Sequence, residues 1–322
     1  MPLLDLLNKA CMENQTIITE FILLGLSSDP QLQLFLFLLF LIIYVVTLLG
    51  NTVIMLVIRL EFILHTPMFF FLNHLAFVDI CYSSVTLPKM LRNLITSQKT
   101  ISWEGCIAQI FFFFQAACVE VFILSAMAYD RYVAICDPLH YTTIMKKEIC
   151  RQLVGGAWIM GFLYGVANAL PLVNLHFCRN NKINHYSCEI PSLLPLSCDA
   201  TVTNYVVLLA SSFLFGLTSF LLTLVSYIYI IVTILKIHSA EGRSKAFSTC
   251  SSHLIVVVLF YGTGYFRYLR PNSSSSVVID QIFSIQYSIS TPMLNPIIYS
   301  LKTKEVKEAI KKLVRQNIHY SC

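Results

Sequence analysis

The sequence predicts an all-α membrane protein, a seven-transmembrane helix bundle with a short amphipathic helix after the last span. Of the 322 residues, 57% are hydrophobic and only 12% are charged, with a mean hydropathy of +0.71. This charged fraction is about half that of a soluble globular protein. Seven stretches are long and apolar enough to cross roughly 30 Å of hydrocarbon. An apolar stripe opposite a lysine-rich face follows the last stretch and predicts the final helix.

The segment before the first apolar stretch, residues 1–31, is mixed in polarity. It lacks a basic region followed by a short apolar run and a small-residue cleavage site, so we expect no cleaved signal peptide. The first span should then direct membrane insertion itself. Asn14-Gln15-Thr16 is a glycosylation sequon, which is used only in a segment that faces the lumen. We therefore predict an extracellular N-terminal segment with Asn14 as a candidate glycosylation site.

The predicted spans form one transmembrane domain over residues 32–301. Each has roughly the 20 apolar residues that a spanning helix needs. Asn73, His74 and Asp79 interrupt the second span, and a run of Ser, Gln and Pro interrupts the seventh. The expected spans cover approximately residues 32–58, 68–87, 107–128, 153–172, 205–237, 252–269 and 282–301.

Basic residues predict the orientation, because cytoplasmic loops carry an excess of Lys and Arg. With the N-terminus outside, most of the 22 Lys and Arg residues fall at inner helix ends and in the C-terminal tail. An outside N-terminus and an inside C-terminus require an odd number of spans, which seven satisfies. We expect a multi-pass protein of the cell membrane in this orientation.

The C-terminal residues 302–322 should form a cytoplasmic amphipathic helix and tail. Val306, Ile310 and Leu313 recur at helical spacing opposite several lysines. A helix of this kind lies on the membrane surface, where its basic side chains contact anionic lipid. The basic tail therefore favours membrane lipid as a partner, and we expect no nucleic acid partner.

Four cysteines fall on the expected outer side. Cys106 is at the outer end of the third span, and Cys178, Cys188 and Cys198 lie in the outer loop, residues 173–204. Disulfides are their expected use in this oxidising compartment. A bridge from Cys106 would hold the loop over the helices, but four cysteines allow three pairings and their spacing does not select one.

The outer loop also holds residue types that bind copper or zinc. His185, Cys188 and Glu189 are close in sequence, with His176 nearby. A disulfide-bonded cysteine has no thiolate to offer a metal. We therefore expect ordinary polar loop residues here, no metal site and no cofactor.

Asn51, Asp79, Glu120 and Asn295 fall within the predicted hydrocarbon region. Acids at such depth are costly and commonly functional. Counting 1.5 Å per helical residue places Asp79 and Glu120 at a similar level. They could form a proton relay, a catalytic carboxylate pair, or a cation and hydrogen-bond cluster that sets helix packing. The residues by themselves leave these three alternatives open.

Arg131 stands at the inner end of the third span, between Asp130 and Tyr132. An arginine at a membrane boundary often does no more than extend its charge to water. Considered alone, Arg131 is best interpreted in this way.

Several stretches taken together resemble the odorant receptor branch of the rhodopsin-like (class A) G-protein-coupled receptors. They occupy the ends of most spans and cover the chain from about residue 20 to 310. A random apolar chain would not produce them in this order. In chain order they include Gly50-Asn51, LHTPMFFFL (64–72), MAYDRYVAIC (127–136), KAFSTCSSHL (245–254) and PMLNPIIYS (292–300).

The resemblance implies an inner switch at Asp130, Arg131 and Tyr132, with Arg131 released to meet the G protein when the sixth span swings outward. It implies that Tyr227 and Tyr299 stabilise that open arrangement. It also implies that Asn51, Asp79, Glu120 and Asn295 form a central polar cluster, and that Cys106 pairs with Cys188, leaving Cys178 with Cys198.

The ligand cavity of the family lies beside one face of the third span. Residues on that face recur at i, i+4 and i+8. The partners implied on other spans are mostly apolar or small and none is charged, so we expect a small volatile with one hydroxyl or carbonyl. The candidate ligand-binding residues are Phe113, Phe114, Ala117, Cys118, Val121, Ser211, Ser212, Phe215, Tyr261, Gly264, Tyr265, Tyr268, Ile285, Ser288 and Ile289.

The function that the resemblance implies is detection of a chemical stimulus in smell, by an odorant receptor that activates a stimulatory G protein and raises cyclic AMP. The alternative is a transporter or channel that uses Asp79 and Glu120, which predicts an internal repeat and interrupted helices that we do not find. An intramembrane enzyme would need a motif such as H-E-x-x-H or G-x-S-x-G, and the sequence contains neither. We therefore expect a receptor and not an enzyme.

Overall fold

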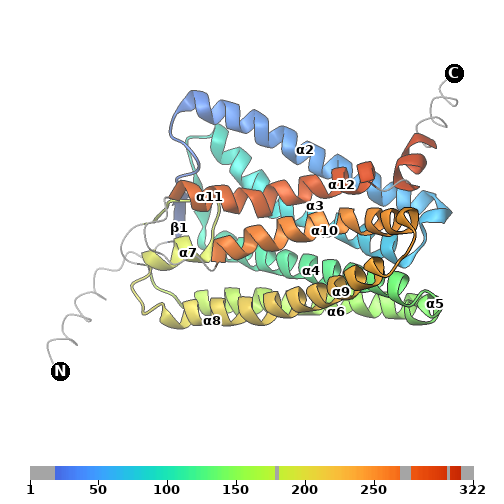
Figure 1. Ribbon diagram of the computed structural model, residues 1–322. Helices are drawn as coiled ribbons and strands as arrows, with labels where there is room; N and C mark the ends of the chain where they lie inside the picture. Colours follow the sequence, from blue (N-terminus) through green and yellow to red (C-terminus); the bar gives the residue numbers. More distant parts are fainter. Residues whose placement is uncertain (1–18, 178–180, 269–276, 303–304, 313–322) are drawn as a thin grey trace, which may run out of the picture.

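The computed structural model describes residues 19–177, 181–268, 277–302 and 305–312. Long helices lie side by side, with strand β1 and helix α7 at one end of the bundle and α5 at the other (Figure 1). The long helices are α2 (Pro30–Leu60), α3 (Pro67–Ile95), α4 (Trp103–Cys136), α6 (Lys147–Ala169), α8 (Val202–Ser212), α9 (Thr218–Leu235), α10 (Ala240–Tyr268), α11 (Val277–Ile285) and α12 (Thr291–Lys302).

Short elements connect these helices. The 3-10 turns are η1 (Phe62–Leu64), η2 (Leu170–Leu172) and η3 (Leu194–Leu196), and the short helices are α5 (Tyr141–Ile144) and α7 (Ile190–Leu193). The strands are β1 (Glu20–Leu23), β2 (Thr100–Ser102) and β3 (Lys182–Ile183).

Local sequence explains where the first helices begin. The Asp29 carboxylate accepts a hydrogen bond from the Gln31 amide at the start of α2, and Pro30 takes the first helical position. Pro67 has the same place in α3. Proline is well suited to this position because its missing N–H would have no partner there. The boundaries therefore follow from the chain itself.

Five helices among the described residues are long and apolar enough to cross a membrane. They run over Pro30–Leu60, Pro67–Ile95, Trp103–Cys136, Lys147–Leu172 and Val202–Leu235, and a shorter apolar stretch covers His253–Gly262. Several of these helices extend beyond the spans expected from hydropathy. The third, for example, begins before residue 107 and ends after residue 128, since a helix continues past the layer whose apolar character hydropathy detects.

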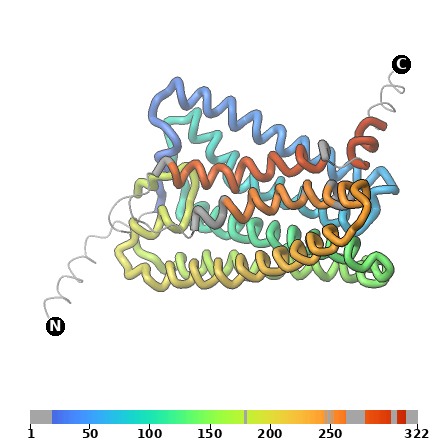
Figure 2. The backbone as a smooth tube through the Cα atoms, viewed as in Figure 1, coloured from blue at the N-terminus to red at the C-terminus, as the bar shows by residue number. Residues whose placement is uncertain are grey.

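Helix α4 lies at the centre of the bundle and packs against α3, α6 and α9. The contact with α6 is close because Gly161 has no side chain. A Cβ atom there would lie 2.5 Å from a Val119 methyl group and 2.8 Å from the Gln115 carbonyl oxygen. Helix α10 packs against α11 and α12, and it also contacts α4 (Figure 2). Residues on α4 can therefore contact side chains from most of the other helices.

Two π-helical turns interrupt long helices. One is η4 (Phe213–Leu217), between α8 and α9, and the other is η5 (Gln286–Ser290), between α11 and α12. A π turn inserts an extra residue and changes which residues face a neighbouring helix, and such turns are common at functional sites. Both lie in stretches where the sequence predicts ligand contacts.

Three short strands form a small sheet at the end of the bundle that holds α7 (Figure 1). Strand β1 is central, antiparallel to β2 and parallel to β3. Phe21 and Leu23 of β1 are fully buried, and the Phe21 ring contacts Trp103 and Phe177. The sheet thereby attaches residues 20–23 to the outer loop and to the start of α4.

Residues 305–312 are helical. Val306 is fully buried and Ala309 nearly so, and both pack into the main hydrophobic core. The Lys312 ammonium group forms an ion pair of 2.9 Å with Glu61. Leu313, the third residue of the predicted stripe, lies outside the described residues. The apolar face of this segment therefore packs partly against the bundle, and Ala309 belongs to it.

Candidate functional site

Two aromatic residues of the predicted ligand-binding face lie at the centre of a cluster of rings. The Phe113 ring contacts Phe114 at 5.5 Å between centroids, Tyr82 of α3 at 5.2 Å and Tyr287 of η5 at 5.6 Å. Phe114 contacts Tyr164 of α6 at 5.3 Å. Edge-to-face packing at these distances is favourable. Four segments thus contribute to one aromatic surface around Phe113.

The candidates on α8 and η4 contact α6. A hydrogen bond of 3.0 Å joins the hydroxyl groups of Ser212 and Tyr164, and the Phe215 ring lies 5.0 Å from the Tyr164 ring. Asn168 donates to the Ser211 hydroxyl oxygen at 3.1 Å. Because Tyr164 also contacts Phe114, these residues are continuous with the aromatic surface. Tyr164 and Asn168 were not among the candidates, since residue spacing within one helix does not reveal a partner on another.

The candidates on the seventh predicted span pack toward Tyr186 of the outer loop rather than toward Phe113. Ile289 is fully buried and packs with Ile285 in a separate cluster that contains Tyr186. Ser288 lies 3.4 Å from the Tyr186 hydroxyl group. Tyr287, which was not a candidate, contacts Phe113. The structure therefore does not bring Ile285 and Ile289 to the aromatic surface, because the face of this segment that carries Tyr287 contacts Phe113.

The remaining candidates lie on α4, in the turns that follow Phe114, and on α10. Cys118 and Val121 are buried, and Ala117 is half-buried. The Tyr261 ring contacts Phe220 of α9 at 5.5 Å. Gly264, Tyr265 and Tyr268 belong to α10, but their side chains lie outside the described residues.

The outer loop is attached to α4 directly above these residues. A disulfide joins Cys106 to Cys188, which confirms the pairing that the family resemblance implied. The Gln109 carboxamide oxygen accepts a hydrogen bond of 2.8 Å from the Cys188 amide, and its nitrogen donates to the Val85 carbonyl at 3.0 Å. Cys198 is also disulfide-bonded, whereas its expected partner Cys178 lies outside the described residues.

An acidic side chain of this loop is buried against the seventh predicted span. Glu189 is 5% exposed and accepts hydrogen bonds from the hydroxyl groups of Ser284 and Tyr287. His185 Nε2 lies 3.6 Å from the same carboxylate oxygen. Glu189 was considered only as a metal ligand in the sequence. Its contact with Tyr287, and through Tyr287 with Phe113, places a charged group beside a surface expected to have none.

The four polar residues expected at the centre are buried, and three of them tie helices together. Asn295 donates to both carboxylate oxygens of Asp79, at 3.0 and 2.9 Å. Asn51 donates to the Pro292 carbonyl at 3.1 Å. Neither carboxylate oxygen of Glu120 has a hydrogen-bond partner among the residues that the structure describes. Asn51, Asp79 and Asn295 thus connect α2, α3 and the start of α12.

The inner end of α4 carries an ion pair held by a tyrosine. Arg131 donates to Asp130 at 3.0 and 2.5 Å, and the Tyr141 hydroxyl of α5 donates to the other oxygen of Asp130 at 2.7 Å. Burial and the nearby Asp130 carboxylate raise the pKa of the Tyr141 phenol, so it remains a donor. Tyr132 is half-buried, with its ring 5.7 Å from that of Tyr229.

The two tyrosines expected in the inner switch differ in their contacts. A hydrogen bond of 2.7 Å joins the Tyr227 hydroxyl to His253 Nδ1 of α10, and their rings are stacked. Tyr299 is fully buried, and its hydroxyl has no hydrogen-bond partner within the described ranges. His253 is the last residue but one of the KAFSTCSSHL stretch. The sequence therefore contained a signal for this contact between α9 and α10, but we did not predict the contact from it.

Comparison with known proteins assigns the chain to a family. The family model described as "Olfactory receptor" matches residues 40–317. The chain belongs to the olfactory receptor family. Olfactory receptor 8S1 of Homo sapiens is 55% identical over 294 residues, which make up 91% of this chain and 81% of that protein. Olfactory receptor 5B21 of Homo sapiens is 50% identical over 305 residues, 95% of this chain and 98% of that protein.

Family membership confirms several expectations. The receptor is a multi-pass membrane protein of the class A G-protein-coupled receptors and is not an enzyme. Its general partners are an odorant and a G protein. This membership does not favour the alternative of a transporter or channel built on Asp79 and Glu120.

Proposed function

We propose that the receptor binds a small, mostly apolar volatile in the outer half of its helix bundle and activates a stimulatory G protein, raising cyclic AMP. The aromatic surface around Phe113 is the observation that carries this proposal. It joins α3, α4, α6 and η5 beneath a loop that the Cys106–Cys188 disulfide attaches to α4. Aromatic surfaces with a few placed polar groups are typical of small-molecule sites.

The proposed topology has seven spans, with the N-terminus outside and the C-terminus inside. Besides the five long apolar helices, α10 would provide the sixth span and α11, η5 and α12 together the seventh. The low apolar content of α10 arises from its first residues, 240–251, which would lie in the cytoplasm. Asn14 would then be extracellular and open to glycosylation, and the Lys face of residues 305–312 would contact anionic lipid.

The polar part of the ligand is proposed to be a hydroxyl group. Glu189, Ser284 and Tyr287 form a hydrogen-bonded group beside Phe113, and a carboxylate in that group repels a ligand carboxylate. A hydroxyl group can both donate to and accept from such a network. This favours small alcohols and phenols over organic acids.

A ligand screen tests the proposed class. Cells that express the receptor should raise cyclic AMP with small alcohols or phenols and show a weaker response to the matching acids. Phe113→Ala removes the ring shared by three aromatic contacts, so the agonist concentration for half-maximal response should rise at least tenfold. Phe112→Ala is the matched control, because Phe112 is the residue next to Phe113 and is 53% exposed. Organic acids as the strongest agonists would overturn the ligand class.

We propose that the structure represents the arrangement that precedes activation, and two contacts support this. Arg131 is paired with Asp130, and Tyr227 contacts His253, so α9 and α10 are closed over the inner end of α4. An agonist can open this arrangement only through its higher affinity for the open one. We propose that opening releases Arg131 to the G protein, while Tyr227 leaves His253 to stabilise the open state with Tyr299.

Tyr141→Phe should raise signalling in the absence of odorant. The substitution removes the hydrogen bond that holds Asp130 against Arg131, and bonds to charged groups contribute roughly 1.5–3 kcal/mol. If part of that energy stabilises only the closed arrangement, basal cyclic AMP should rise several-fold at equal surface expression. Tyr129→Phe is the control, because Tyr129 is an exposed tyrosine near the end of α4 that carries Asp130 and Arg131. Unchanged basal cyclic AMP in Tyr141→Phe would exclude this role.

A further inference from the structure

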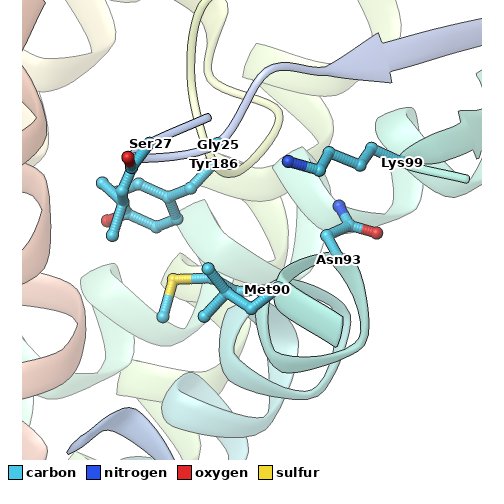
Figure 3. A pocket seen from close by; sticks show the side chains of 8 residues that line it. Gly25, Ser27, Met90, Asn93, Lys99 and Tyr186 are labelled. Atoms are coloured by element: carbon cyan, nitrogen blue, oxygen red, sulfur yellow. The ribbon is translucent and has the colours of Figure 1, made fainter. Parts of the chain in front are cut away.

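The small cleft at the end of the bundle that holds the sheet is too narrow for an organic ligand. Asn93, Lys99 and Tyr186 line it, with Gly25 and Ser27 beside them (Figure 3). The space that a water-sized sphere can occupy there is about 10 Å³, which is enough for about one water molecule. This cleft therefore offers no second ligand site.

The turn η1, at the far end of α2 from the sheet, holds two large apolar side chains away from the protein. Phe62 is 85% exposed and Ile63 is 72% exposed, whereas the next residue, Leu64, is fully buried in the main hydrophobic core. The Leu64 amide donates to the Glu61 carbonyl at 3.0 Å, and the His65 amide donates to the Phe62 carbonyl at 3.0 Å. Because Leu64 anchors this closed turn, Phe62 and Ile63 cannot fold inward without breaking it.

These two side chains follow directly on an exposed apolar stripe of α2. Its members recur at intervals of three or four residues and are Leu49, Val53, Leu56 and Leu60. Residues at this spacing lie on one face of a helix. Only 11% of the most apolar stretch of α2 is buried, against 72% in α4, so most of α2 faces lipid in a receptor that spans a membrane. Phe62 and Ile63 thus continue a lipid-facing surface past the last residue of the helix.

The charged groups around the turn are compatible with a membrane surface. Glu61 is the only acid among residues 59–65, and its side chain is 13% exposed and paired with the Lys312 ammonium group at 2.9 Å. Arg59 and His65, on either side of the turn, are exposed. Apolar side chains flanked by basic ones are typical of segments that bind at the surface of a membrane. The single acid of the turn is neutralised by its ion pair and does not oppose this contact.

We propose that this turn inserts into the membrane leaflet at its end of the bundle, with Phe62 and Ile63 at the boundary between headgroups and acyl chains. Exposed apolar surface marks a contact with a protein or with a membrane. The continuity with the stripe of α2 selects the membrane, because Leu60 already faces lipid two residues before Phe62. Segments at a membrane surface bury their apolar face about 5–10 Å into this boundary. The insertion requires only that the receptor spans a membrane, whichever side the turn faces.

An inserted turn also positions the helical residues 305–312. The Glu61 carboxylate of the turn holds Lys312, and Val306 is buried in the same hydrophobic core as Leu64. The two segments are therefore fixed to one another, and insertion of the turn holds residues 305–312 close to the same leaflet.

Phe62→Trp in the full-length receptor, in phosphatidylcholine nanodiscs, tests the insertion. The wild-type receptor contains Trp103 and Trp158, so its spectrum in the same lipid is subtracted to give the emission of the added indole. This emission should be blue-shifted. Lipid with bromine atoms near the headgroup end of its acyl chains should quench it several-fold more strongly than lipid brominated at the chain ends. Thr142→Trp, at an exposed polar position of α5, is the control and should emit as an indole in water does, with little quenching.

A double variant gives a second test whose result depends on the partner of the turn. Acidic side chains are costly in lipid but not in water. Phe62→Asp combined with Ile63→Asp should therefore lower the midpoint of thermal unfolding in nanodiscs by several degrees. Phe62→Leu combined with Ile63→Leu, which keeps both positions apolar, should leave the midpoint unchanged.

Three results would each overturn the proposal. They are a water-like emission of the added indole, a blue-shifted emission that brominated lipid does not quench, and an unchanged midpoint in the acidic double variant. The second result would place the turn against protein, such as another copy of the receptor. Neither measurement uses an odorant or a G protein, so both outcomes are independent of the proposed function.

Discussion

Replacing Arg131 by alanine should abolish odorant-driven cyclic AMP, reducing the response at least tenfold, while leaving the amount of receptor at the cell surface unchanged. Arg131 lies near the end of α4, where its side chain is 14% exposed and paired with Asp130. In the proposed mechanism, its guanidinium group becomes available to a G protein only after α10 moves away from α9. Alanine keeps the helix intact, but it has no guanidinium group that could contact the G protein.

The controls separate signalling from folding. Arg151→Ala removes an exposed basic residue in the first turns of α6, and this variant should signal normally. Arg131→Lys keeps the charge but loses the planar donor group, so it should restore only part of the response. A normal cyclic AMP response from Arg131→Ala at normal surface expression would refute the assignment of this residue to the switch.

Breaking the Cys106–Cys188 disulfide should have the largest effect on folding. The bond closes a loop with a sequence separation of 82 residues. Constraint of the unfolded chain by a loop of this length is worth roughly 4.5 kcal/mol. That is a large part of the net stability of a typical domain. Cys106→Ser and Cys188→Ser should therefore each lower both the midpoint of thermal unfolding and the fraction of receptor that reaches the cell surface.

A double variant tests whether the bond itself is responsible. Cys106→Ser combined with Cys188→Ser should be no less stable than either single variant, since the second substitution removes nothing further. Cys81→Ser is the control, because Cys81 is a free, half-buried cysteine of α3. Wild-type surface expression of Cys106→Ser would show that the loop is held by its other contacts, including the Gln109 hydrogen bond to Cys188.

The comparison between expectation and structure is most instructive at the seventh predicted span. Helical spacing and family resemblance placed Ile285, Ser288 and Ile289 beside the ligand, but Tyr287 contacts Phe113 instead. Tyr287 lies on a different face of the helix from Ile285 and Ile289, because residues two positions apart do not share a helix face, and the π turn η5 falls in the same stretch. Residue spacing shows which residues share a face of a helix, but it does not show which face meets Phe113 on another helix.

The outer loop shows a similar difference. The sequence indicated that Cys106 and the loop cysteines form disulfides without choosing among three pairings, and family resemblance selected Cys188 as the partner of Cys106. It did not indicate that Glu189, the residue after Cys188, is buried against Ser284 and Tyr287. A loop acid is normally solvent-exposed, so only the folded chain could reveal this burial.

The sequence by itself determined that this protein is a helical membrane protein and an odorant receptor. Lipid imposes apolar helices whose composition is visible in the chain, and the family motifs are contiguous stretches that need no folding to be recognised. Tertiary structure alone decided which side chains meet. The carboxylate of Glu189, which lies beside Phe113 through Tyr287, depends on contacts between residues distant in sequence. Their contacts depend on helix rotation and loop path, which hydropathy and spacing do not record.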